Sequence, residues 1–159
     1  MHTESSNSQR NTKTWIMLGQ TQRAMFRARQ KGLSPFDISP EQSATLVVIE
    51  TLGDKATPTE IARCIFREPS TVSELLNRME KKGLLSKAAN SKKKNSVKVQ
   101  LTPKGKEVFK NSLQQETIND IMSSLSESEH QQLRLILEKI WSSSLEQLNK
   151  RRQPIFPAF

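Results

Sequence analysis

Residues 69–85 read PSTVSELLNRMEKKGLL, and this stretch decides the fold. Four of its apolar residues follow the i, i+3, i+4, i+7 spacing of one helix side: Val72, Leu75, Leu76 and Met79. Pro69 suits the first helical position, and a basic last turn before Gly83 is typical of a helix end. The pattern predicts an amphipathic helix from about residue 69 to residue 82, with short polar side chains on its other side.

Two shorter helices are predicted before this stretch. Residues 39–42 (SPEQ) and 57–60 (TPTE) each combine a hydroxyl N-cap, a proline at the first helical position and Gln or Glu three residues after the cap. These signals predict helices that begin at about residues 40 and 58, the first ending near Gly53. These two helices are short and are joined by a tight turn.

A β-hairpin is predicted after Gly83. Residues 84–88 favour a strand, and residues 97–101 alternate apolar and polar side chains with the period of a strand. Residues 90–96 between them (NSKKKNS) are basic and turn-forming, which gives the hairpin a positively charged tip. Thr102-Pro103 then opens another helix.

Both ends of the chain carry longer amphipathic segments, from about residue 13 to 29 and from residue 103 onward, with a capping box at residues 126–129. In so small a chain such helices need a partner, and the simplest partner is a second copy. The side chains expected at this dimer interface are Leu18, Leu137, Ile140, Trp141, Leu145 and Leu148.

Composition and charge indicate a single domain that binds a polyanion. The chain has 159 residues, of which 34% are hydrophobic, fewer than the usual 45% or so, which favours an extended shape or a shared interface. Residues 55–110 hold 14 of the 25 basic and 5 of the 16 acidic side chains, so they carry the whole net charge of +9. With no apolar run of membrane length and a polar start, we expect a cytoplasmic protein that does not bind membranes.

The sequence gives little support for a metal site or for catalysis. Cys64, His2 and His130 do not have zinc-ligand spacing, so we expect no metal and no cofactor. Paired carboxylates in an apolar setting, a nucleophile elbow and a phosphate-binding glycine loop are all missing from the sequence, so we predict no catalytic residues and no enzyme. Cys64 is interpreted as a small core residue.

The predicted order of elements is that of a winged helix-turn-helix lobe, mainly α with a small β-hairpin wing. Such a lobe inserts one helix into the DNA major groove and the wing into the adjacent minor groove. The helix from residue 69 is the predicted reader, in which Asn77 suits adenine edges and Glu74 can accept from cytosine. The residues expected to contact DNA are Thr57, Ser70, Thr71, Ser73, Glu74, Asn77, Arg78, Lys92, Lys93, Lys94 and Asn95.

Four segments together resemble the MarR family of bacterial and archaeal transcription regulators. They are residues 59–62 (TEIA), 69–73 (PSTVS), 77–85 (NRMEKKGLL) and 101–105 (LTPKG). The ungapped resemblance covers about residues 44–110. It implies a homodimer that binds a pseudo-palindromic operator in double-stranded DNA, usually as a repressor released by a small aromatic ligand.

The resemblance also implies an effector pocket where the dimer helices meet the lobe. The residues expected to line it are Trp15, Met25, Phe26, Phe36 and Phe109, for each of which core packing is the alternative. The sequence departs from the family pattern in two features. The Asp-x-Arg usual in the wing is replaced by residues 93–95 (KKN), so Lys would substitute for Arg, and Glu74 stands where the family often has a basic or polar residue.

The expected organisation has five parts. A disordered N-terminus (1–12) precedes the N-terminal dimerisation helix and its connection (13–38), the DNA-binding lobe (39–105), the C-terminal dimerisation helices (106–150) and a tail (151–159). The leading hypothesis is a homodimeric, sequence-specific DNA-binding regulator that represses transcription until a small-molecule effector releases it. The rival is a winged-helix module that binds acidic protein segments without specific DNA binding, which Glu74 and the missing wing arginine favour slightly.

Overall fold

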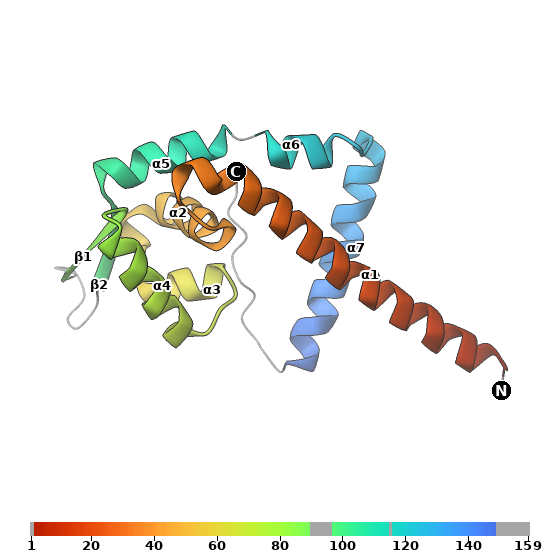
Figure 1. Cartoon of the computed structure of the whole chain (residues 1–159). Helices are drawn as coiled ribbons and strands as arrows, with labels where there is room; N and C mark the ends of the chain where they lie inside the picture. The colour runs from red at the N-terminus through yellow and green to blue at the C-terminus, as the bar shows by residue number, and fades with distance from the viewer. Residues whose placement is uncertain (1, 90–96, 115, 149–159) are drawn as a thin grey trace.

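A helical lobe with a two-stranded hairpin forms one side of the molecule, and the long helices from the two ends of the chain both lie toward its other side (Figure 1). The computed structural model describes residues 2–89, 97–114 and 116–148. The fold is the mainly α, winged arrangement that the sequence predicts. In chain order the elements are α1 (His2–Leu33), η1 (Ser34–Phe36), α2 (Pro40–Leu52), η2 (Gly53–Lys55), α3 (Pro58–Cys64), α4 (Pro69–Lys81), β1 (Leu85–Ala89), β2 (Val97–Leu101), α5 (Pro103–Leu113), α6 (Thr117–Met122) and α7 (Glu127–Gln147).

The predicted helix starts are confirmed by their caps. Ser39 Oγ accepts from the Gln42 N–H at 3.1 Å, and Gln42 Oε1 accepts from the Ser39 N–H at 3.0 Å, which completes a capping box at the start of α2. At α3 only half of the box forms. Thr57 Oγ1 accepts from the Glu60 N–H at 3.3 Å, but the Glu60 carboxylate pairs with Arg63 instead of returning to the cap.

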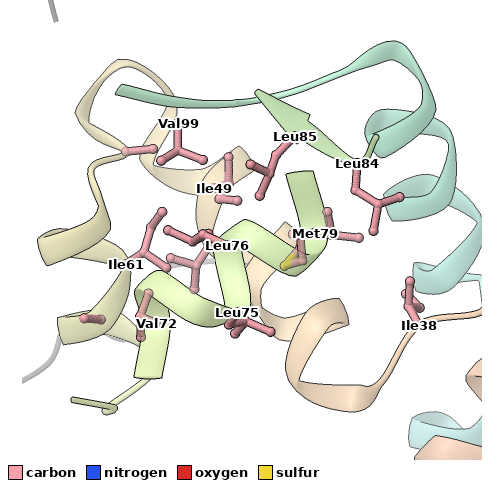
Figure 2. Close-up of a cluster of buried hydrophobic side chains, with 14 of the residues drawn as sticks. Ile38, Ile49, Ile61, Val72, Leu75, Leu76, Met79, Leu84, Leu85 and Val99 are labelled. Carbon is pink, nitrogen blue, oxygen red and sulfur yellow. The ribbon is translucent and has the colours of Figure 1, made fainter. Parts of the chain in front are cut away.

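The core of the lobe is built around the apolar side of α4. Val72, Leu75, Leu76 and Met79 are all buried, as the spacing of residues 69–85 predicts. Figure 2 shows them packed among side chains from the neighbouring elements, including Ile49, Ile61, Leu84, Leu85 and Val99. Full burial of one such side chain stabilises a fold by about 1.5–3 kcal/mol, so this packing sets how α4 is rotated in the lobe.

Backbone hydrogen bonds attach the hairpin to the lobe at the residue before β1 and at Val99 in the middle of β2. In the antiparallel pair Leu85 lies opposite Leu101, and the Val99 N–H donates to Ala56 O at 2.9 Å. β1 begins one residue later than predicted. The reason is that Leu84 belongs to the turn: its N–H donates to Met79 O at 3.0 Å and its carbonyl accepts from the Thr102 N–H at 3.2 Å.

The N-terminal segment corrects one expectation. Residues 1–12 are predicted to be disordered, but α1 begins at His2. The segment contains neither Pro nor Gly, so no helix-breaking residue ends the helix there. In Figure 1 the N-terminal half of α1 extends well away from the lobe.

At its other end α1 is joined to the lobe. The Arg29 Nη2 donates to Ser112 O of α5 at 2.8 Å, and burial lowers the pKa of this guanidinium. The C-terminal segment after Pro103 is divided into α5, α6 and α7. The predicted wing tip (90–96) and tail (151–159) lie outside the described residues.

Gly105 gives a direct test of this packing. A Cβ at Gly105 would lie 1.8 Å from Leu84 O, so Gly105→Ala must push α5 away from the turn that precedes β1. We expect a loss of about 1–3 kcal/mol in the free energy of unfolding, measured by urea denaturation. The control is Gly19→Ala within α1, where the nearest atom to the new Cβ is Arg23 Nη2 at 3.5 Å, and where we expect a gain of up to about 1 kcal/mol. Equal effects of the two substitutions would contradict this account.

Candidate nucleic-acid interface

The side of α4 that faces away from the core forms a continuous polar surface. It is referred to below as the polar face of α4 and consists of Ser70, Thr71, Ser73, Glu74, Asn77 and Arg78, all exposed. The first turn of α4 contains no acidic residue, and the acidic side chain at this end of the helix is that of the N-cap residue Glu68, which makes no cap hydrogen bond to the helix. Short hydroxyls at this end and an amide further along can reach phosphates and base edges, respectively.

Thr57 lies apart from the polar face of α4 and has a structural contact of its own. It is half-buried, and its hydroxyl oxygen caps α3 by accepting from the Glu60 N–H. A hydroxyl that accepts one hydrogen bond still carries a proton to donate. The position at a helix start is therefore compatible with both a cap and a phosphate contact.

Asn77 is held by a residue of the wing. The Lys87 ammonium, on β1, donates to Asn77 Oδ1 and lies 3.2 Å from Glu80 Oε2. Glu80 also accepts from the Lys87 backbone N–H at 3.2 Å. Sequence reasoning did not include Lys87 or Glu80 among the site residues, because the contact depends on how the hairpin folds back along α4.

Of the 14 basic side chains in residues 55–110, five form ion pairs with described residues of the chain, three of them with acidic residues that precede this segment. Ion pairs join Arg63 to Glu60, Arg67 to Glu41, Lys82 to Asp37, Lys87 to Glu80 and Lys98 to Asp54. Arg78 on the polar face of α4 is exposed at the surface. The four residues expected at the wing tip, Lys92, Lys93, Lys94 and Asn95, lie outside the described residues.

The residues expected to line an effector pocket do not form one group. Trp15 is 74% exposed and borders an open cavity of about 510 Å³ whose other lining residues are on α7. Met25 and Phe26 are each 41% exposed on α1. Phe36 and Phe109 are half-buried against the lobe core.

The residues expected at a dimer interface also divide into two sets. Leu137, Ile140 and Leu148 are exposed, and Leu18 is half-buried. Leu145, by contrast, is only 4% exposed within a single chain. Trp141 makes an edge-to-face contact with Phe66, whose ring centroid lies 4.7 Å away, just after α3. Leu135 and Ile136 on the same helix are also exposed; Ile136 is one turn before Ile140 and so extends the predicted stripe, whereas Leu135 lies on the opposite side of the helix.

Cys64 is half-buried and packs against the core. Burial raises the pKa of its thiol, which lowers the thiolate fraction at neutral pH and does not favour a reactive cysteine. Within residues 2–89, 97–114 and 116–148, no three His, Cys, Asp or Glu side chains gather as a metal site would require. In the same part of the chain, no helix has the length and apolar character to cross a membrane.

Comparison with known proteins agrees with this geometry. Residues 36–94 match the model of the MarR family, whereas no curated protein matches the sequence. The organohalide-sensing transcriptional regulator RdhR-CbdbA1625, solved ligand-free and with 2,4-dichlorophenol bound, is 28% identical, with a TM-score of 0.84 over 94% of this chain and 89% of that one. MepR of S. aureus in complex with DNA is 28% identical, with a TM-score of 0.73 over 80% of this chain and 96% of that one.

A mutant of MarR from E. coli complexed with operator DNA has the same fold. Its TM-score is 0.73 at 22% identity, over 79% of this chain and 91% of that one. The family match spans α2, α3, α4 and β1, and the likeness to RdhR-CbdbA1625 extends over almost all of the chain. Over residues 36–94 the chain is therefore similar to the MarR family, and it shares the winged helix-turn-helix fold of the transcription regulators RdhR-CbdbA1625 and MepR.

Proposed function

We propose that this chain is a homodimeric, sequence-specific DNA-binding regulator, with α4 as the helix that enters the major groove. One observation carries the proposal: burial of the apolar side of α4 leaves its opposite side exposed as an uninterrupted polar face. A protein that only needed a solvated helix would more often carry long Glu/Lys pairs there. The complexes of MepR and MarR with DNA support the same use of the fold.

The proposed dimer is supported by apolar side chains that a single chain leaves exposed. Trp15 and Met17 on α1 are 74% and 69% exposed, and Leu137 and Ile140 on α7 are 45% and 37% exposed. Large apolar surface of this kind marks an interaction site. A second copy would cover it and would hold two α4 helices at a fixed separation, about 34–36 Å for half-sites one helical turn apart.

We further propose that the regulator represses transcription and is released by a small aromatic effector. The support is the dichlorophenol-bound form of RdhR-CbdbA1625, together with the aromatic side chains Phe36 and Phe109, which are half-buried near the junction of the lobe and the flanking helices. The two lobes can adopt an arrangement that fits DNA and one that does not. A ligand releases DNA only to the extent that its affinity for the second arrangement exceeds its affinity for the first.

Selection of duplexes from a random DNA pool at two salt concentrations tests the proposed function. We expect a two-fold symmetric motif with half-sites about one helical turn apart. Asn77→Ala should cost roughly 1–3 kcal/mol of discrimination at one base pair in each half-site. The matched control is Asn119→Ala, another exposed asparagine, which lies on α6 away from the polar face of α4.

The proposed function would be contradicted if the selected duplexes shared no sequence motif and if their binding were lost at moderate salt. Binding of that kind is the sequence-independent attraction of any basic surface for phosphates. The chain would then be better explained as a winged-helix module that binds acidic protein segments.

The dimer is tested by placing carboxylates in the exposed apolar surface. The double variant Leu137→Glu/Ile140→Glu should be monomeric by sedimentation and should bind the selected duplex about 100-fold more weakly, because the two lobes no longer bind together. Ser142→Glu, at an exposed position elsewhere around α7, is the control and should remain dimeric. If the double variant sediments and binds like the wild type, the dimer does not use this surface.

A further inference from the structure

The side-chain amide of Asn77 is fixed from the wing, which bears on what α4 can recognise. The Lys87 ammonium donates to Asn77 Oδ1, and an ammonium has three donors and no acceptor. The amide nitrogen therefore cannot take the place of the oxygen in this contact. The oxygen and nitrogen of an asparagine are often hard to tell apart, but here the chemistry of the partner decides between them.

Lys87 is itself held in place. Its side chain is only 21% exposed, and Glu80 accepts from both its backbone N–H and its ammonium, each at 3.2 Å. Glu80 and Asn77 are both on α4, three residues apart, so one carboxylate and one amide of the same helix share the ammonium. The contact is thus a small network of charge-assisted hydrogen bonds, which are stronger than neutral ones.

This network leaves the Asn77 side chain with more free hydrogen-bond donors than acceptors. No described residue accepts from Asn77 Nδ2, so both of its N–H donors remain for another molecule. A freely rotating asparagine pairs with adenine by accepting from N6 and donating to N7 at once. With one lone pair of its oxygen taken by lysine, Asn77 instead presents two donors and one remaining acceptor site, and its donors match the acceptors of guanine (N7 and O6) and of thymine (O4).

We propose that Lys87 determines sequence specificity by orienting the Asn77 amide, so that Asn77 selects a base with acceptors on its major-groove edge. The inference rests on the proposed function, since it concerns what α4 reads once it lies in the groove. Lys87 is a positioning residue: it acts through Asn77 and contacts no base.

The test compares the motifs selected by four proteins from one random duplex pool: wild type, Lys87→Met, Lys87→Arg and Lys98→Met. Lys98 is the matched control, because it lies on the other strand of the wing, is 23% exposed and pairs with Asp54 away from α4. Its removal costs the same charge. Asn77→Ala, alone and combined with Lys87→Met, identifies the base pair that Asn77 contacts.

On the strand that Asn77 contacts, we expect the wild type to prefer guanine or thymine over adenine or cytosine by about 10-fold or more. Lys87→Met should abolish most of this preference at that base pair and leave the rest of the motif intact. Lys87→Arg, which also offers only donors, should restore the preference, and Lys98→Met should not change it. In the Asn77→Ala background, Lys87→Met should have no further effect on the motif.

Three results would overturn the inference. They are an unchanged preference in Lys87→Met, an equal loss at all positions of the motif, or an Asn77→Ala motif identical to that of the wild type. Absence of any motif with the wild type would instead refute the proposed function, and the inference with it. If Lys87→Met fails to fold in a thermal melt, Lys87→Gln is used, whose amide can bond to either orientation of Asn77 and should relax the preference in the same way.

Discussion

Burial of one side of α4 is the constraint on which the rest of the structure depends. Val72, Leu76 and Met79 are each 0% exposed, so rotation of α4 about its axis would expose apolar side chains and bury polar ones. The core thus fixes which residues face solvent. The exposure of the polar face of α4 is a consequence of core packing, whereas the Asn77 side chain within it is held by Lys87 of β1.

The wing is coupled to α4 by two sets of contacts. The backbone between α4 and β1 is bonded on one side to Met79 and on the other to Thr102, which caps α5 by accepting from the Gly105 N–H. Lys87 and Glu80 then tie β1 to the exposed side of α4. α5 then continues toward the C-terminal helices, so this turn connects them to α4. In the proposed regulator, it is the route by which the proposed dimer interface can act on α4.

Local chemistry explains why so much of the fold is predictable. Ser39, Thr57 and Thr102 cap helices through neighbouring residues, and the period of α4 marks its buried side, so short windows of sequence suffice. Contacts between distant segments are different. The bond from Lys87 to Asn77 and the burial of Leu145 depend on tertiary packing that no local pattern encodes. The helical start of α1 was missed because polar residues of low helix propensity resemble a disordered segment.

The central claim is that the polar face of α4 reads DNA in the major groove. The most direct measurement is binding to the selected duplex with each purine replaced in turn by its 7-deaza analogue, which lacks the N7 acceptor of the major-groove edge. The account predicts weaker binding only for purines in two major-groove segments about one helical turn apart. Binding that is unaffected by every such replacement would contradict it.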